Sequence, residues 1–153
     1  MTRRQFAVAA LAGGVLAGVL DIVYAFIWLG ANGRTPQWVL QSVASGWLGR
    51  AAFSGGLGAA ALGLASHLGI SVAAAAIYGA AVRGSAWVRV HWIAGGIAFG
   101  VLVYLFMNFV VIPLSAAPFG PSWAPRAFIQ GFISHAVVVG LPIAWVWRRA
   151  LRP

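Results

Sequence analysis

Acidic side chains are almost absent from this sequence. Among 153 residues, Asp21 is the one carboxylate side chain, and there is no glutamate. Cysteine is absent too, which excludes a disulfide framework, a thiolate metal site and a cysteine nucleophile. Lysine is also missing, and with it any glycine loop whose lysine would hold a phosphate. Few side chains therefore remain on which chemistry can rest.

Charge of either sign is scarce, whereas apolar residues are abundant. Only 7% of the residues are charged and 62% are hydrophobic, whereas soluble domains have about 25% charged and about 45–50% apolar residues. The composition indicates an integral membrane protein, and the length predicts a single domain over residues 1–153. The lipid bilayer is therefore the expected partner.

The net charge of +9 comes from ten arginines against Asp21. A strongly basic chain can bind nucleic acid, but such binding needs a basic stripe on one face of a folded domain. Here the arginines flank apolar segments instead, which is the usual pattern of membrane anchoring. We therefore expect no nucleic-acid partner.

Four apolar segments are long enough to cross a bilayer, which takes about 20 residues in a helix. They cover residues 6–29, 55–82, 91–114 and 127–147. Tryptophans fall near the segment ends, where amphipathic rings favour the membrane interface: Trp28, Trp92, Trp123, Trp145 and Trp147. The sequence thus predicts an all-α fold, a four-helix transmembrane bundle.

The arginines also predict the orientation of the bundle. The larger group flanks one side of the predicted spans: Arg3, Arg4, Arg83, Arg89, Arg148, Arg149 and Arg152. The smaller group flanks the other side: Arg34, Arg50 and Arg126. The positive-inside rule places the larger group, and with it both termini, in the cytoplasm.

The first outer connection is predicted to contain a further short helix over residues 36–49. Thr35 and Pro36 are typical of an N-cap and a first helical position, and Gly49 is typical of a helix end. At about 20 Å the helix is too short to span, so it should lie in the outer interface or re-enter the membrane. The second outer connection, residues 115–126, is proline-rich and is expected to be a stiff loop.

Each predicted span carries a stripe of small residues, which lets helix backbones approach closely in lipid. Each stripe also carries a polar residue at helical spacing. The four polar residues on these stripes are Asp21, His67, Asn108 and His135. A carboxylate inside a membrane costs roughly 2.5–3.5 kcal/mol on insertion scales and points to function. These residues form the candidate intramembrane polar cluster.

Depth within the spans predicts which members of the cluster pair. At about 1.5 Å per residue, Asp21 and His135 each lie roughly 12 Å below the outer edge, Asn108 about 9 Å and His67 about 18 Å. We therefore expect Asp21 to pair with His135, with Asn108 adjacent and His67 roughly a turn deeper.

Three interpretations of the cluster stay open. A hydrogen bond between Asp21 and a histidine would fix helix register. A proton or ion relay would use the titration of histidine near neutral pH. A metal or haem site would use His67 and His135, although their different depths weaken it. His-Glu-x-x-His and Gly-x-Ser-x-Gly motifs are absent, so we expect no enzyme, no cofactor and no bound metal.

Several segments carry a resemblance that covers most of the chain. They are QSVASGWLGRAAF at 41–53, ALGLASH at 61–67, YLFMNFVVIPLS at 104–115 and GLPIA at 140–144. Together they resemble a group of small uncharacterised bacterial inner-membrane proteins with four predicted spans. The resemblance implies that topology and a bacterial inner membrane, and it implies no activity.

The cluster and the spans together predict a small transport-like or proton- or ion-handling membrane protein. The alternative is a structural or accessory membrane subunit whose polar cluster only fixes helix packing. A homo-oligomer or a membrane partner stays open under either interpretation.

Overall fold

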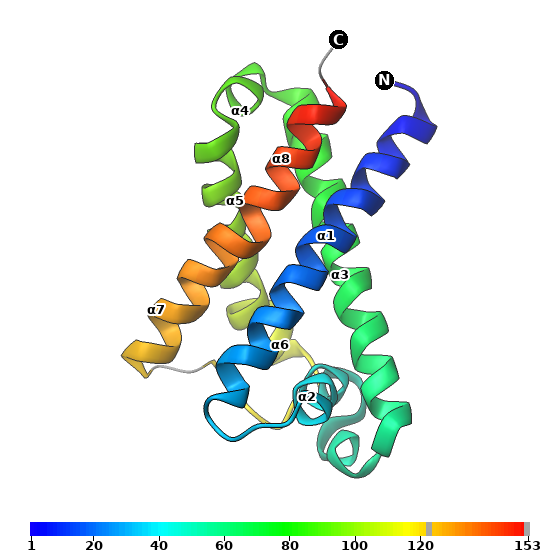
Figure 1. Ribbon diagram of the computed structural model, residues 1–153, viewed down its shortest axis with the longest axis vertical. Coiled ribbons are helices and arrows are strands. Elements are labelled where there is room, and N and C mark those ends of the chain that lie inside the picture. Colours follow the sequence, from blue (N-terminus) through cyan, green and yellow to red (C-terminus); the bar gives the residue numbers. More distant parts are fainter. Residues whose placement is uncertain (122–123, 152–153) are drawn as a thin grey trace.

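The computed structural model describes residues 1–121 and 124–151, and these residues form helices and connecting turns without a strand (Figure 1). Four helical stretches are long and apolar enough to cross a membrane: Arg3–Gly30, Gly56–Gly84, Trp92–Leu114 and Pro125–Ala150. The predicted all-α fold with four stretches of spanning length is confirmed, and each boundary lies within a few residues of its predicted position.

Local contacts of side chains with the backbone stabilise one end of each of the first two long helices. Helix α1 (Arg3–Gly30) begins with a capping box in which the Thr2 hydroxyl accepts the Gln5 N–H and the Gln5 side chain accepts the Thr2 N–H. Helix α3 (Gly56–Gly84) is followed by a short helix, α4 (Ala86–Val90). Nη1 of Arg89 donates to the carbonyls of Val82 and Arg83, at 3.0 and 3.2 Å, and so satisfies the end of α3.

The third and fourth stretches are each interrupted by a π-helical segment. Helix α5 (Trp92–Phe106) continues through η2 (Met107–Val111) into α6 (Ile112–Leu114). Helix α7 (Pro125–Ser134) continues through η3 (His135–Gly140) into α8 (Leu141–Ala150). Each π segment is closely followed by a proline, Pro113 or Pro142, which has no N–H for the carbonyl four residues earlier. A widened turn accommodates that loss.

The segment between α1 and α3 is a helix followed by a 3₁₀ turn. Helix α2 (Pro36–Leu48) begins at the N-cap Thr35, whose hydroxyl accepts the Trp38 N–H at 3.1 Å. It ends at Gly49, whose φ of 57° favours glycine, and η1 (Gly49–Ser54) follows. The α2 backbone packs against Gly63 of α3, where a Cβ would collide with the Leu40 carbonyl.

The bundle has two chemically different ends. The N-terminus, α4 and the last turn of α8 lie at one end, and α2 lies at the other (Figure 1). The arginines of the first end are Arg3, Arg4, Arg83, Arg89, Arg148 and Arg149. Those of the second end are Arg34, Arg50 and Arg126. Trp123 and Arg152, which the sequence analysis placed at the interface and in the first group, lie outside the described residues.

The main hydrophobic core lies toward the first end, among α1, α3 and α8. Trp147 is fully buried there, and its indole N–H donates to the Ala75 carbonyl at 2.8 Å. The ring fits because Gly79 of α3 leaves it room. Toward the second end, a smaller hydrophobic cluster of Ala44, Ala52 and Ala59 lies beside the buried polar residues Gln41 and Ser45.

Candidate functional site

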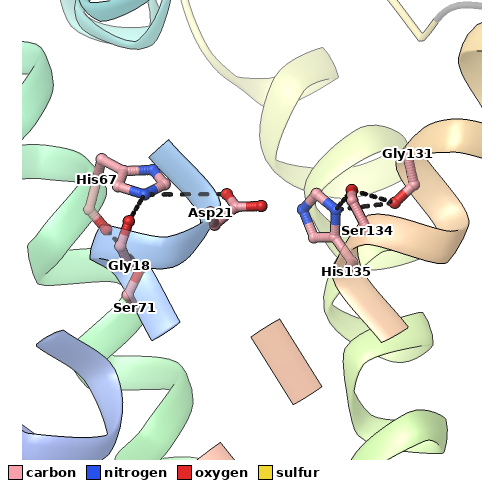
Figure 2. Close-up of polar contacts among 7 residues, drawn as sticks. All are labelled: Gly18, Asp21, His67, Ser71, Gly131, Ser134 and His135. Carbon is pink, nitrogen blue, oxygen red and sulfur yellow. Dashed lines mark hydrogen bonds and ion pairs between the residues drawn. The ribbon is translucent and has the colours of Figure 1, made fainter. Parts of the chain in front are cut away.

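Asp21 of α1 faces His67 of α3. The carboxylate oxygen Oδ2 lies 3.9 Å from Nε2 of His67, and each side chain keeps 16% of its surface exposed. This distance is an electrostatic contact and is too long for a hydrogen bond. Figure 2 shows the two groups pointing toward one another across the α1–α3 contact.

The same His67 nitrogen makes a second, shorter contact. Nε2 lies 2.9 Å from the carbonyl oxygen of Gly18 in α1. A carbonyl only accepts hydrogen bonds, so Nε2 must carry a proton and donate it to Gly18. On α3, the Ser71 hydroxyl donates to the His67 carbonyl at 2.9 Å. His67 is thus fixed between the two helices, with its N–H directed at the backbone and not at Asp21.

Small residues make this approach of α1 and α3 possible. A Cβ on Gly14 would collide with the backbone of Val72, and one on Gly18 would lie 2.9 Å from the Ser71 hydroxyl. Because no side chain separates the helices at these points, the Gly18 carbonyl comes within reach of the His67 ring. The glycine stripe therefore positions the polar pair directly.

The structure corrects the predicted partner of Asp21, which is His67 and not His135. The predicted depths were counted from the predicted end of each span. They assumed that all the spans are straight and end at the same level. Measured from the observed helix ends at Gly30 and Gly56, Asp21 and His67 lie at similar depths of about 14 and 17 Å. The crossing of α1 and α3 at Gly14 and Gly18 then fixes their contact.

His135, at the start of η3, bonds within its own helical stretch. Nδ1 lies 2.9 Å from the Gly131 carbonyl and 3.3 Å from the Ser134 hydroxyl. The ring also packs against Tyr104, at 5.3 Å between centroids. In the view of Figure 2 the other ring nitrogen lies on the side of Asp21, although no hydrogen bond or ion pair of the described residues joins the two side chains.

Among the described residues, Asn108 in η2 has no hydrogen bond or ion pair to Asp21, His67 or His135. Its amide donates to the Tyr104 carbonyl at 2.9 Å, one turn back in the same stretch. The cluster predicted from the stripes is therefore divided. Asp21 and His67 are in contact, whereas His135 and Asn108 each bond to a carbonyl of their own helical stretch.

Sequence reasoning missed the residues that complete the site. The carbonyl of Gly18 is the acceptor for His67, and a stripe of small residues in the sequence does not reveal such a backbone acceptor. The π segments that contain Asn108 and His135 were also missed, although Pro113 and Pro142 inside apolar spans were a visible signal for irregular backbone. Among residues 1–121 and 124–151, no three histidine or acidic side chains gather closely enough to hold a metal ion.

The fold and the site define a class of protein: an all-helical chain with four stretches of membrane-spanning length and an acid–histidine pair between the first two. No known protein family, curated protein or solved structure matches this chain. Function is therefore inferred from the geometry of the site.

Proposed function

We propose that this chain is a multi-pass protein of the bacterial inner membrane in which Asp21 and His67 take up and release a proton. The protein would be a small transport-like protein or one that handles protons or ions. Both termini would be cytoplasmic, because α1 begins and α8 ends at the arginine-rich end of the bundle. Helix α2 would lie at the outer interface, consistent with its 13 residues and its packing on α3.

The observation that supports this proposal is the pairing of the chain's one carboxylate. Asp21 has one ion-pair partner in the described part of the chain, and the N–H of that partner is directed at Gly18. No side chain or backbone donor of the described residues hydrogen-bonds the carboxylate. An ionised carboxylate in an apolar region is costly without such donors.

Two charge states satisfy the pair, and they differ by the position of one proton. Asp21 is either neutral beside a neutral imidazole, or ionised beside an imidazolium. In both states Nε2 keeps its N–H to Gly18, so the change of charge needs no rearrangement of the helices. Because both states hold the same number of protons, conversion of one into the other takes the release of a proton at one group, the carboxylate or Nδ1 of His67, and the uptake of a proton at the other. The titratable side chains on the elements that pack against α1 near Asp21 are His67 of α3 and His135 of η3 (Figure 2).

A structural role is the second candidate, and one contact favours it. The His67–Gly18 hydrogen bond joins two helices at 2.9 Å, which by itself fixes their register. Interhelical hydrogen bonds in membranes contribute about 0.6 kcal/mol on average. In that case the charge of Asp21 would not matter for the role of the protein, and asparagine at position 21 would replace it without loss.

The single aspartate makes a direct test available. Protein labelled with ¹³C-aspartate carries the label in one side chain, because the sequence contains one aspartate and no glutamate. Infrared spectra in lipid bilayers should show a labelled carboxylic-acid band that appears and disappears reversibly as the pH changes. Asp21→Asn should remove the band while the protein remains folded, because the amide keeps an acceptor but cannot titrate.

His67 supplies the control for coupling within the pair. In His67→Gln the pH dependence of the carboxylic-acid band should change, because glutamine cannot carry a positive charge beside the carboxylate. A band that ignores the substitution, or no pH-dependent band at all, would favour the structural role. The two candidates also differ in the activity of Asp21→Asn in reconstituted vesicles. The proton-handling proposal expects this variant to lose transport-like activity, whereas the structural role expects no loss.

A further inference from the structure

A cavity at the arginine-rich end of the bundle is chemically distinct from the Asp21–His67 pair. Its volume is about 240 Å³, whereas a single water needs only about 10–15 Å³ of such space. The lining comes from α3, α4, α5 and α8: Tyr78, Val82, Val88, Arg89, Trp92, Ala144, Arg148 and Leu151. Two arginines and a tyrosine are the polar members of this lining.

The two arginines are held in place by contacts that leave their charge unpaired. Nη1 of Arg89 donates to the Val82 and Arg83 carbonyls, which fixes the guanidinium at the end of α3. The Arg148 guanidinium stacks on the Trp92 ring at 4.8 Å from its centroid. Stacking uses the face of the guanidinium and leaves its N–H edge available.

No acidic side chain pairs with either of them. The chain has one acidic side chain, and it faces His67 near the other end of the bundle. Both guanidinium groups are exposed beside the cavity, so they are free to pair with an anion from outside the chain. Planar guanidinium forks match the oxygens of a phosphate group particularly well.

Tyr78 provides independent evidence for a ligand. Its side chain is 2% exposed, and its hydroxyl is the one buried side-chain polar atom in the described part of the chain without a hydrogen-bond partner. The hydroxyl lies beside Gly95, where a Cβ would come within 3.3 Å of it. Buried hydroxyls are nearly always bonded, so an orphan one in the lining of a cavity calls for an acceptor.

We propose that this cavity binds a phosphate-bearing anion, with Arg89 and Arg148 pairing with its charge and Tyr78 donating a hydrogen bond. The proposal is independent of the proton-handling function. The same chemistry is offered by the headgroup of an anionic phospholipid and by a free phosphorylated solute. The headgroup is the expected source under the proposed orientation, because basic pockets between spans on the cytoplasmic side of a membrane recruit anionic lipids.

Calorimetric titration of the full-length protein in uncharged detergent tests the proposal. The titrants are short-chain phosphatidylglycerol, short-chain phosphatidylcholine and inorganic phosphate. Saturable binding of phosphatidylglycerol alone supports a lipid site, and saturable binding of inorganic phosphate supports a site for solutes. Equal binding of phosphatidylcholine and phosphatidylglycerol without phosphate binding, or no saturable binding of any of the three, overturns the proposal.

Three variants and one control locate the binding. Arg89→Gln and Arg148→Gln should each weaken phosphatidylglycerol binding about tenfold or more, because each removes a charge-assisted contact. Arg149→Gln is the matched control: it removes the same charge from the next residue of α8, which stacks on Trp145 outside the cavity. Equal weakening by Arg149→Gln would show diffuse surface attraction and overturn the site.

Tyr78→Phe separates binding from folding. The variant keeps the net charge and removes a hydroxyl that has no partner in the ligand-free protein, so thermal stability without ligand should stay the same or rise. Binding should weaken several-fold. A Tyr78→Phe protein that binds phosphatidylglycerol as well as the parent protein would exclude the hydroxyl from the site.

Discussion

His67 shows how one ring nitrogen can serve both structure and charge. Its N–H is directed at the Gly18 carbonyl, and the carboxylate of Asp21 lies 3.9 Å from the same nitrogen. The hydrogen bond is a property of the folded helix pair, whereas the electrostatic contact depends on protonation. Substitutions that keep the donor and remove the charge separate the two.

We expect His67→Ala to lower the free energy of unfolding by about 0.5–2 kcal/mol, because it removes an interhelical hydrogen bond and leaves Asp21 without a partner. His67→Gln should recover part of this loss, since its amide can donate to Gly18. His91→Ala is the control, because His91 is exposed and bonds only to Trp87 of its own turn. Denaturation in mixed detergent micelles measures all three, and a loss in His67→Ala no larger than in His91→Ala contradicts the assignment.

At the scale of the helices, glycines decide which side chains meet. The contacts of α1 with α3 and of α5 with η3 are backbone contacts, in which Gly14 meets Val72, Gly100 meets the His135 carbonyl and Gly140 meets the Gly96 carbonyl. Close approach of this kind supplies the van der Waals contact that replaces the hydrophobic effect in lipid. The polar pair depends on the first of these crossings.

Gly14→Ala tests that dependence. A Cβ at this position collides with the Val72 backbone, which cannot rotate away as a side chain would. Overpacking of this kind typically costs about 1–3 kcal/mol, and moving α1 from α3 should also weaken the His67–Gly18 bond. The labelled Asp21 band should then lose its sensitivity to His67→Gln.

Gly69→Ala is the matched control for Gly14→Ala, because it lies in α3 with nothing within 4 Å of the added carbon. Alanine favours a helix over glycine by about 1 kcal/mol, so this variant should be as stable as the parent protein or more stable. Equal stability of the two variants would mean that the α1–α3 crossing is looser than the structure shows.

The helices could be predicted from the sequence, whereas the contacts between them could not. Apolar length gave the four long stretches, and Thr35, Pro36 and Gly49 gave the bounds of α2 almost to the residue, because these signals are local. The partner of Asp21 is not local: it depends on the relative level of α1 and α3, which the Gly14 and Gly18 crossing sets. The stripes of small residues predicted which helix faces meet. The depth of each residue, counted along its own predicted span, predicted His135 as the partner of Asp21, which is wrong.

At the scale of the whole molecule, the distribution of arginine divides the bundle into two ends. The end with the N-terminus, α4 and the last turn of α8 holds most of the arginines and the cavity at Tyr78, whereas the other end holds α2 (Figure 1). The main-chain N–H of Ala116 donates to the Gly46 carbonyl at 3.0 Å, which joins the two connections at the second end. This asymmetry makes the proposed orientation testable without reference to activity.

The absence of cysteine gives a clean background for labelling. Gln37→Cys in α2, Gly120→Cys in the second outer connection and Ala86→Cys in α4 all replace exposed residues. A membrane-impermeant thiol reagent added to intact cells of an expression host should reach Gln37→Cys and Gly120→Cys, because the side with fewer arginines faces outward. Ala86→Cys should react only after the membrane is permeabilised. Labelling of Ala86→Cys in intact cells would reverse the orientation, and labelling of Gln37→Cys and Gly120→Cys from opposite sides would mean that the chain does not cross the membrane four times.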